Sequence, residues 1–505
     1  MATKSATKTT SSSKIRAGLK HPVIDSDGHQ VEYLAPIEDY VKKIAGTKFA
    51  VRFPRSVQRM TGETNEQRRR RGGVCPPWWN LPAENTLDRA TGALPKLMYE
   101  RLDEMGIDYA VLFPTAGLGL DVYRTGSQTI DSRLDPEVTR IRDRATNMYR
   151  FDITREYADR MMPVPSIPME NPKTAIEDLE FCVKQLGAKA VSLSSVLRPI
   201  AALKEKFPEM FAPRSQFSSA GCRVDGFGID REYNYDPFWA KCVEFKVPVM
   251  DHGGSMGWTS HNSASNHMYN TIGMFANGHE AACKSIFLGG ITRRFPDLRI
   301  AFLEGGVGWG GRLYADMVGR WKKRNIKAIS QYDPANFDRK LYKKLFEQYG
   351  DDVIKRKMDM LFQTTVGIEP EDVPAELRDE WYPCKINKVE DFLDLYIKPF
   401  YFGCEGDDPT NALAFNSKMW PLGAKLNAIY SSDFGHWDVP DMKEVLEEAW
   451  ELVEHELMTV EDFRDFTFTN PVKLFAGTNP DFFKGTVVEK ETDKELKRLI
   501  KAGVV

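Results

Sequence analysis

The stretch Val23-Ile-Asp-Ser-Asp-Gly-His-Gln-Val-Glu32 decides how the rest of the sequence is interpreted. Its first two residues are typical of the end of a buried strand, and polar residues follow them at once. If the strand continues to His29, the alternation of side chains places Asp25, Asp27 and His29 on one face. Asp27 and His29 then project together beyond the strand. An oxygen and an imidazole nitrogen at that point can hold a cation.

The same residues also fit a simple turn. Asp, Ser and Gly favour the point where a strand stops, and Asp27-Gly28 is a strong turn dipeptide. The two interpretations differ in one expectation, because a metal site needs further ligands elsewhere in the chain and a turn does not. The rest of the sequence therefore decides between them.

Helical and strand patterns alternate along most of the chain. After the first strand, further strands are predicted at residues 107–114, 161–166, 188–193, 247–251, 298–303, 397–403 and 427–431. Such alternation is typical of a parallel sheet built from crossover units. Counting from Val23, there are eight strands, the number that closes a barrel. The predicted fold class is therefore α/β, a (β/α)8 TIM barrel with long insertions at its C-terminal face.

An open, doubly wound sheet is the structural alternative. That fold places a Gly-rich, phosphate-binding turn after its first strand. Here the corresponding turn is Asp25-Ser-Asp-Gly-His29, and its carboxylates would repel a phosphate. The barrel is therefore the favoured architecture.

The predicted domain organisation is a single barrel with extensions. Residues 1–20 contain Lys, Ser, Thr and Ala but no acidic residue and no apolar run, which predicts a disordered tail. Residues 21–480 are predicted to form the metal-dependent barrel, and residues 481–505 a C-terminal extension. Cover inserts are expected at about 30–94, 197–235, 253–278 and 322–395.

Composition narrows the class of partner. The chain has 505 residues, of which 42% are hydrophobic and 28% charged, and its net charge of -3 gives no indication of nucleic acid or of an anionic membrane. No window is apolar enough to span a bilayer. The seven cysteines are scattered without a Cys-x-x-Cys pair, which argues against a cysteine zinc site and favours a reducing, cytoplasmic location. The large inserts predict a homo-oligomer.

Polar residues follow the later strands at the positions where a barrel gathers its active site. His252 follows the fifth strand, Glu304 the sixth, Glu405 the seventh, and Asp433 and His436 the eighth. Singly, each has an ordinary explanation, since a histidine before two glycines fits a turn and an acidic residue can cap a helix. Their coincidence at four strand ends, together with the first-strand pair, favours a metal site.

Several motifs show similarity to a known family. They are Gly290-Ile-Thr-Arg-Arg-Phe-Pro-Asp-Leu-Arg299 leading into Phe302-Leu-Glu-Gly-Gly306, Ser432-Asp-Phe-Gly-His436, and Asn470-Pro-Val-Lys-Leu-Phe475. With them the chain resembles the amidohydrolase superfamily, in particular the amidohydrolase-2 branch that includes aminocarboxymuconate-semialdehyde decarboxylase. The resemblance covers most of residues 22–477.

The resemblance implies a metal site at the strand ends. The implied ligands are Asp27, His29, His252, Glu304 and Asp433. The usual first-strand motif is His-x-His, whereas this chain has Asp27-x-His29, which makes the site more anionic and better suited to Mn²⁺ or iron than a purely imidazole site. The expected cofactor is a divalent ion, Zn, Mn or Fe, with one or two ions per chain. Glu405 or Glu32 are candidates for holding a second one.

The predicted function is hydrolysis of a small molecule. A metal-activated water would attack an amide, ester, thioester or lactone of a cyclic or aromatic substrate, with Asp433 as the general base. Glu304 is a further ligand or an alternative base, and His436 contacts the substrate or braces Asp433. The decarboxylase relatives carry a histidine after the sixth strand, where this chain has Glu304.

Two alternatives stay open. One is non-oxidative decarboxylation of an aromatic or cyclic acid, and the other is a non-catalytic barrel. The predicted substrate contacts are His279, which opens a helix, Trp258 on the loop at 253–278, and Glu405. Aromatic residues of the inserts suit a ring-shaped substrate, although packing explains them equally well.

Overall fold

The computed structural model of the chain describes residues 10–47, 63–71, 74–75, 77, 84–115, 136–211, 221–252, 263–333, 336–364, 378–436 and 438–505. Its centre is a set of eight parallel strands. They are β1 (Ile24–Gln30), β2 (Tyr109–Pro114), β3 (Met161–Pro163), β4 (Val191–Leu193), β7 (Val249–Asp251), β8 (Ile300–Phe302), β9 (Phe400–Cys404) and β10 (Asn427–Tyr430). Each of the eight predicted strands is present, with shorter bounds in most cases.

The strands form two parallel sheets, in the orders β1-β2-β3 and β10-β9-β8-β7-β4. On one side a parallel bridge between Ser166 and Ser192 joins the β3 and β4 segments. On the other side, the Asp433 N–H donates to the Asp27 carbonyl at 2.9 Å, and the His29 N–H donates to the carbonyl of the residue after Asp433 at 2.7 Å. The parallel α/β architecture is thus confirmed, and these links arrange the strands as the closed ring that the sequence predicts.

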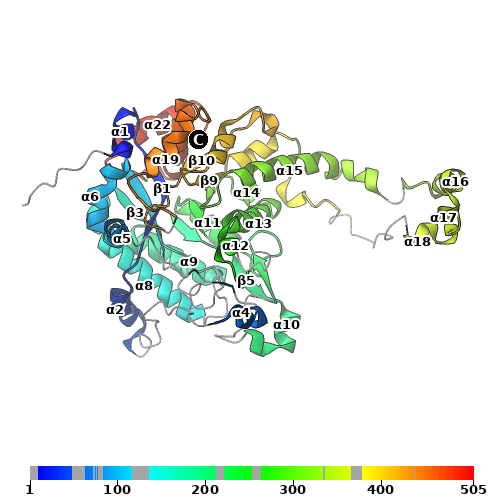
Figure 1. Cartoon of the computed structure of the whole chain (residues 1–505), viewed down its shortest axis with the longest axis horizontal. Helices are drawn as coiled ribbons and strands as arrows, with labels where there is room; N and C mark the ends of the chain where they lie inside the picture. Colours follow the sequence, from blue (N-terminus) through cyan, green and yellow to red (C-terminus); the bar gives the residue numbers. More distant parts are fainter. Residues whose placement is uncertain are drawn as a thin grey trace, which may run out of the picture.

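Helices surround this ring (Figure 1). The larger ones are α2 (Leu34–Ala45), α5 (Thr86–Ala93), α6 (Pro95–Met105), α8 (Pro136–Thr154), α9 (Pro172–Phe181), α11 (Asp236–Glu244), α13 (Met274–Leu288), α15 (Gly308–Arg324), α16 (Arg339–Tyr349), α19 (Val445–Glu454), α21 (Asn470–Thr478) and α22 (Glu489–Lys501). Shorter helices are α4 (Asn65–Arg71), α10 (Ala201–Lys206), α12 (His267–Thr271), α14 (Ile291–Arg294), α17 (Asp352–Lys355), α18 (Leu361–Thr364) and α20 (Val460–Arg464). The insert predicted at 197–235 contains the antiparallel pair β5 (Val196–Pro199) and β6 (Cys222–Asp225).

One buried arginine fastens helix α8 to three strands. The fully buried Arg150 donates to the carbonyls of Leu112 at 2.8 Å and Val164 at 2.7 Å, and to the side-chain oxygen of Gln30 at 3.2 Å. Hydrogen bonds from a charged donor are stronger than neutral ones, and they satisfy groups that water does not reach. Arg150 therefore fixes the first three strands, one of which carries part of the site described below.

The N-terminal segment differs from its prediction. Residues 11–18, expected within a disordered tail, form helix α1 (Ser11–Gly18), which begins with a capping box at Thr10. The Thr10 hydroxyl donates to the Glu104 carbonyl at 2.6 Å, and the Ser12 hydroxyl donates to the Lys443 carbonyl at 2.5 Å. Composition alone missed this helix, because its docking depends on hydroxyls that bond to distant backbone rather than on an apolar stripe.

A second region lies away from the barrel. Helices α16, α17 and α18 sit beyond the far end of α15, at the right of Figure 1. We call residues 321–360 the arm. Neither α16 nor α17 contains a buried residue. The exposed large apolar side chains of the arm are Ile326, Tyr332, Phe337, Leu341, Leu345, Tyr349, Val353, Ile354 and Met360.

Among the described residues, no helix is both long and apolar enough to cross a membrane.

Candidate metal centre

Strand β1 carries the first two side chains of the site. All seven of its residues are buried, and its pairing with β2 shifts register between Asp25 and Gly28. Asp25 leaves the cluster that strict alternation predicts, because its carboxylate accepts hydrogen bonds from the Ser432 N–H at 3.0 Å and the Ser432 hydroxyl at 2.5 Å. Asp25 thus ties β1 to the end of β10. Asp27 and His29 remain to face the centre of the barrel.

Five side chains from four strand ends converge there. The Nε2 atom of His29 lies 3.1 Å from Glu304 Oε1, 3.2 Å from Asp433 Oδ1 and 3.3 Å from His252 Nε2. Glu304 Oε1 is also 3.2 Å from His252 Nε2. Asp27 Oδ1 lies 3.7 Å from His29 Nε2 and 3.6 Å from His252 Nε2. Residues separated by hundreds of positions therefore present their donor atoms to one small space.

These separations fit a coordination sphere. Ligand atoms about 2.0 to 2.2 Å from a common ion lie roughly 3.0 to 3.5 Å from one another in octahedral or tetrahedral geometry. Within the described residues, both carboxylate oxygens of Asp27 and the Oδ1 atom of Asp433 are buried without a hydrogen-bond donor. Buried carboxylates are normally hydrogen-bonded, paired or bound to a metal. The donor set of three carboxylates and two imidazoles therefore fits a divalent cation.

The protonation of His29 agrees with this arrangement. Burial, then the nearby His436, lowers the pKa of His29 to about 3, which keeps the imidazole neutral. A neutral imidazole has one N–H, and Nδ1 faces the Thr115 hydroxyl at 3.2 Å. When Nδ1 donates to Thr115, Nε2 presents its lone pair to the cluster. Thr115 thereby orients a candidate ligand.

The carboxyl groups are strongly perturbed. Burial, then repulsion from Glu304, raises the pKa of both Asp27 and Asp433 well above the usual value. Burial and the same neighbour raise the pKa of Glu405 to about 8. Burial opposes ionisation of Glu304 too, but the facing His252 and His29 hold its pKa well below the usual range. Carboxylates crowded in this way need either protons or a cation.

Backbone strain places two of the carboxylates. Glu304 and Asp433 have φ values of 56° and 55°, in the left-handed region that non-glycine residues seldom adopt. Each residue follows a strand, β8 or β10, so the strained backbone turns the side chain in toward the barrel axis. Such conformations cost about 1 to 3 kcal/mol and gather at functional sites.

His436 forms a second layer at the mouth of the site. Its Nδ1 lies 3.0 Å from Asp433 Oδ2, and its ring stacks on that of His29 with 4.6 Å between centroids. Glu304, Asp433 and His436 form a second group with metal-ligand spacing, alongside the group of Asp27, His29, His252 and Glu304. Glu304 belongs to both groups.

Other predicted site residues have different surroundings. The fully buried His279 donates from Nε2 to the Leu303 carbonyl at 2.5 Å, and its Nδ1 lies 3.6 Å from Asp251 Oδ2. It lies within α13 rather than at the start of a helix, and these contacts brace β7 and β8. Trp258 lies outside the described residues. Glu32, a candidate for holding a second ion, lies 3.6 Å from the buried Arg150.

Sequence reasoning missed three supporting residues. Thr115 faces the Nδ1 atom of His29, Ser432 binds Asp25, and the Phe113 ring stacks on His252 with 5.1 Å between centroids. Thr115 and Phe113 lie at the end of the second strand. The prediction of site residues at strand ends rested on carboxylates and histidines alone. Position at a strand end was the signal that could have found them.

Fold and site together define a class: parallel α/β barrels with a candidate metal centre at the carboxyl ends of their strands. A family model described as amidohydrolase, Amidohydro_2, matches residues 114–354. The family resemblance predicted from the sequence is therefore confirmed, and this segment is an amidohydrolase-2 segment. It contains His252 and Glu304, whereas Asp27, His29 and Asp433 lie outside the matched range.

The chain is similar to several solved structures, the first of which has the same overall fold. An amidohydrolase from Mycobacterium avium subsp. paratuberculosis K-10 is similar at 19% identity with a TM-score of 0.52, covering 90% of this chain and 100% of the other. A dihydroxybenzoic acid decarboxylase from Polaromonas sp. JS666, solved with manganese and the inhibitor 2-nitroresorcinol, matches at 14% identity and a TM-score of 0.47, covering 90% and 97%. A 2,6-dihydroxybenzoate decarboxylase from Rhizobium matches at 13% identity and a TM-score of 0.46, covering 90% and 98%.

Proposed function

We propose that the protein is a metal-dependent hydrolase that uses an activated water on an amide, ester, thioester or lactone of a cyclic or aromatic small molecule. The observation that carries the proposal is the convergence of Asp27, His29, His252, Glu304 and Asp433, with bare carboxylate oxygens at its centre. Buried, unpaired carboxylates of this kind have no structural use that would offset their desolvation. A bound cation would offset the cost of desolvating these carboxylates and would take part in catalysis.

Asp27, His29, His252, Glu304 and Asp433 are the proposed ligands, and Zn, Mn or Fe the proposed ions, one or two per chain. A divalent ion at this position polarises a carbonyl and lowers the pKa of a water toward about 7. The proposal includes a second ion because Glu304 belongs to both groups of candidate ligands and could bridge two ions.

Asp433 is the proposed general base. Its Oδ2 atom is held by His436 Nδ1 at 3.0 Å, which keeps the carboxylate facing the centre. In hydrolysis, Asp433 accepts a proton as the water oxygen bonds to the carbonyl carbon. It returns that proton to the leaving group when the bond to the carbonyl carbon breaks. His436 is then a positioning residue, and Glu304 is the alternative base.

Aromatic residues beside His252 support a ring-shaped substrate. Phe113 stacks on the His252 imidazole, and Phe275 contacts it edge-on with 6.0 Å between centroids. Phe275 is half-buried, so part of its ring faces outward. Such side chains give a flat apolar wall next to the reacting groups.

Decarboxylation is the second candidate, and one observation favours it. Burial, then Glu304, raises the pKa of Glu405 to about 8, so Glu405 keeps its proton at neutral pH. When the bond to a carboxylate carbon breaks and carbon dioxide leaves, the remaining carbanion needs a proton. Glu405 follows β9 at the same end of the barrel and would be the donor.

We further propose a homo-oligomer in which the arm meets a second copy of the chain. Residues 321–360 contain eleven Lys and Arg but six Asp and Glu, a charge of +5, whereas the whole chain carries -3. The remainder therefore carries -8, which complements the arm. A cytoplasmic location is also proposed, since the seven cysteines are scattered along the sequence without a Cys-x-x-Cys pair.

Elemental analysis and product analysis test these proposals together. Protein purified without added metal should contain at least one equivalent of Zn, Mn or Fe, and Asp27→Asn should contain less than a tenth of that. Lys184→Ala is the control, because Lys184 is exposed and pairs only with surface groups. A wild-type protein free of metal contradicts the proposal and leaves the non-catalytic barrel.

The reaction is assigned with two probes. The ester 4-nitrophenyl acetate in ¹⁸O water reports hydrolysis through ¹⁸O in the acetate, and 2,6-dihydroxybenzoate reports carbon dioxide release. Activity on the second probe alone, with no solvent oxygen in the product, removes the hydrolase and leaves the decarboxylase.

A further inference from the structure

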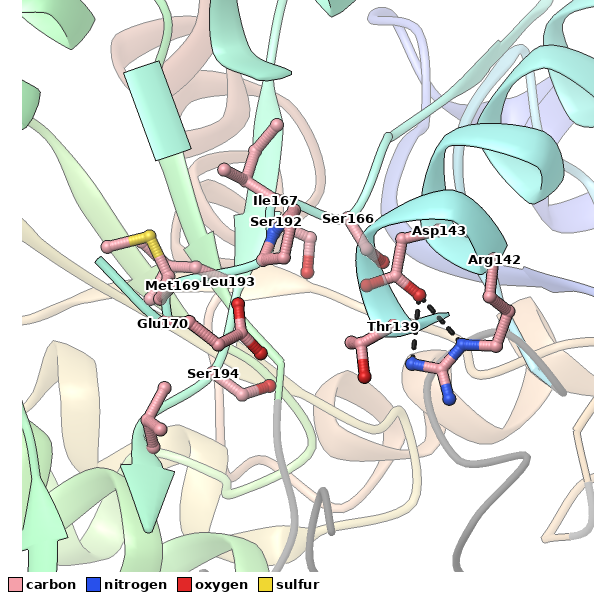
Figure 2. A pocket seen from close by; sticks show the side chains of 12 residues that line it. Thr139, Arg142, Asp143, Ser166, Ile167, Met169, Glu170, Ser192, Leu193 and Ser194 are labelled. Carbon is pink, nitrogen blue, oxygen red and sulfur yellow. Dashed lines mark hydrogen bonds and ion pairs between the residues drawn. The ribbon is translucent and has the colours of Figure 1, made fainter. Parts of the chain in front are cut away.

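A cavity opens next to the candidate metal centre, at the carboxyl ends of β3 and β4. Its volume is about 40 Å³. The lining comes from three segments: the first turns of α8, residues 166–170 after β3, and residues 192–196 at β4. In Figure 2, Glu170 and Ser194 lie on one side of the cavity, and Thr139 and Asp143 on the other. Most of the lining surface is apolar, and several hydroxyl and carboxyl groups are set into it.

Two of the lining hydroxyls are unsatisfied. Ser166 and Ser192 are the paired residues of the bridge between the two sheets, so their side chains start from neighbouring positions. The Oγ atoms of both are buried and form no hydrogen bond within the described residues. A buried hydroxyl without a partner costs roughly 1 to 3 kcal/mol. Their presence here is therefore a second observation, independent of the cavity, that points to a ligand.

The charged residues of the lining are one ion pair and one further carboxylate. Arg142 donates from Nε and from Nη2 to Asp143 Oδ1, both at 2.9 Å, which neutralises that pair. The half-buried Glu170 carboxylate is then the remaining charge of the cavity wall. The Glu170 carboxylate accepts hydrogen bonds, and the two serine hydroxyls can donate or accept, so the lining suits a hydroxyl or amino group that donates to Glu170.

The wall of the cavity is hydrogen-bonded to the backbone of a proposed metal ligand. The Ser194 hydroxyl donates to the backbone carbonyl of His252 at 2.8 Å, and the His252 N–H donates to the Leu193 carbonyl at 3.1 Å. Ser194 and Leu193 both line the cavity, and His252 is a proposed ligand. The cavity wall and the candidate metal centre therefore share hydrogen-bonded backbone at His252.

We propose that this cavity is a substrate subsite that binds a hydroxyl or amino substituent, through Ser166, Ser192 and Glu170, while the reacting group lies at the metal centre. The inference rests on the proposed function, because it places the substituent relative to that centre. A volume of about 40 Å³ admits about three water-sized groups, enough for a small polar substituent and its solvent but not for a ring.

The test measures the binding of matched probes to the manganese-loaded protein by calorimetry. The probes are benzoate and its 3- and 4-hydroxy, 3- and 4-amino, and 3- and 4-methyl derivatives. At one ring position, the hydroxyl or amino probe should bind about tenfold or more tightly than the methyl probe, as expected for a hydrogen bond to a charged group. Ser192→Ala and Glu170→Gln should each reduce that preference to about twofold. Manganese content, measured on the same samples, should stay at the wild-type level.

Matched controls are Ser330→Ala and Glu205→Gln, both at exposed positions. A preference that is absent in the wild type, or that survives both lining variants, overturns the subsite while leaving the proposed function intact. Loss of manganese from the wild-type protein is a different result, since it overturns the proposed function and the subsite with it.

Discussion

Charged side chains are usually exposed and apolar side chains usually buried. The barrel mouth, at the carboxyl ends of the strands, and the arm depart from this pattern in opposite ways. At the mouth, the carboxylates of Asp27 and Asp433 are buried with bare oxygens. On the arm, apolar side chains such as Leu341 and Tyr349 are exposed, the latter by 74%. Buried unpaired charge and exposed apolar surface are both costly in an isolated chain. The contrast supports the two proposals made above: a cation would compensate the buried carboxylates at the mouth, and a second copy of the chain would cover the apolar side chains of the arm.

The largest expected effect is that of metal removal. A cation that binds only the folded state adds about 4 kcal/mol to the free energy of unfolding at a thousandfold excess over its Kd. Chelation with EDTA should lower the midpoint of thermal unfolding accordingly, whereas Asp27→Asn should show no further change. Amide hydrogen exchange along α16 should be the same with and without the ion. If exchange in α16 responds as strongly as exchange near β1, the two regions are not separate.

A smaller effect is expected from pH in metal-free protein. Glu405 titrates at about 4.3 in an unfolded chain and at about 8 in the folded protein. The folded state binds the Glu405 proton more tightly than the unfolded chain does. The resulting stabilisation of the fold is complete below the pKa of Glu405 in the unfolded chain and is lost as the pH rises to about 8. Urea unfolding at pH 5 and pH 8 should differ by a few kcal/mol, on the order expected for such a shift.

Glu405→Gln should remove most of that difference, because the amide does not titrate. The control is Glu451→Gln on the exposed surface. An undiminished pH dependence in Glu405→Gln would assign the effect to other groups at the mouth.

The next prediction concerns packing at the first-strand motif. A Cβ atom on Gly28 would overlap the ring of Phe434, which follows Asp433. Gly28→Ala should therefore destabilise the protein by about 1 to 3 kcal/mol, the usual cost of overpacking, and weaken metal binding as Phe434 moves. Gly18→Ala is the control, since nothing lies within 4 Å of its Cβ position. Equal unfolding midpoints for the two variants would show that the mouth is loosely packed, like the arm.

The smallest effect on folding is expected from the arm. Replacing Leu341 and Leu345 by Ser should change the free energy of unfolding by no more than about 0.5 kcal/mol per site, because both side chains are exposed. The same variant should convert the oligomer to a monomer in light scattering. High salt should act in the same direction, since it screens charge complementarity. Val487→Ser, another exposed apolar position, should leave the assembly unchanged.

Much of the fold followed from local pattern. Most of the parallel strands are short apolar runs, so they and the acids behind β8 and β10 were visible in the sequence. Alternation failed at Asp25, because β1 shifts register against β2 after this residue and the Asp25 carboxylate accepts hydrogen bonds from Asp27 and Ser432. Helix α1 was hidden for a similar reason: its docking hydroxyls bind carbonyls about 94 and 431 positions away in the chain.

The candidate site was predictable as a set but not in detail. Residue types at strand ends indicated His252 and Glu304, and the structure brings them together with His29. The surroundings of His279 were not predictable, because its partners Leu303 and Asp251 are set by how α13 packs across two strands. Thr115 was missed as well, since its position at the end of the second strand is the one sequence signal of its role, and its residue type is not that of a metal ligand.

The left-handed backbone at Glu304 and Asp433 sets stability and chemistry against each other at two positions. Glycine would relax the main chain at either place, by about 1 to 2 kcal/mol, and would delete a carboxylate in the same step. Under selection for robustness alone, both codons should drift toward glycine or asparagine. Retention of the acids in a lineage would then indicate continued selection for catalysis. Their loss would mark descendants in which the barrel no longer catalyses the reaction.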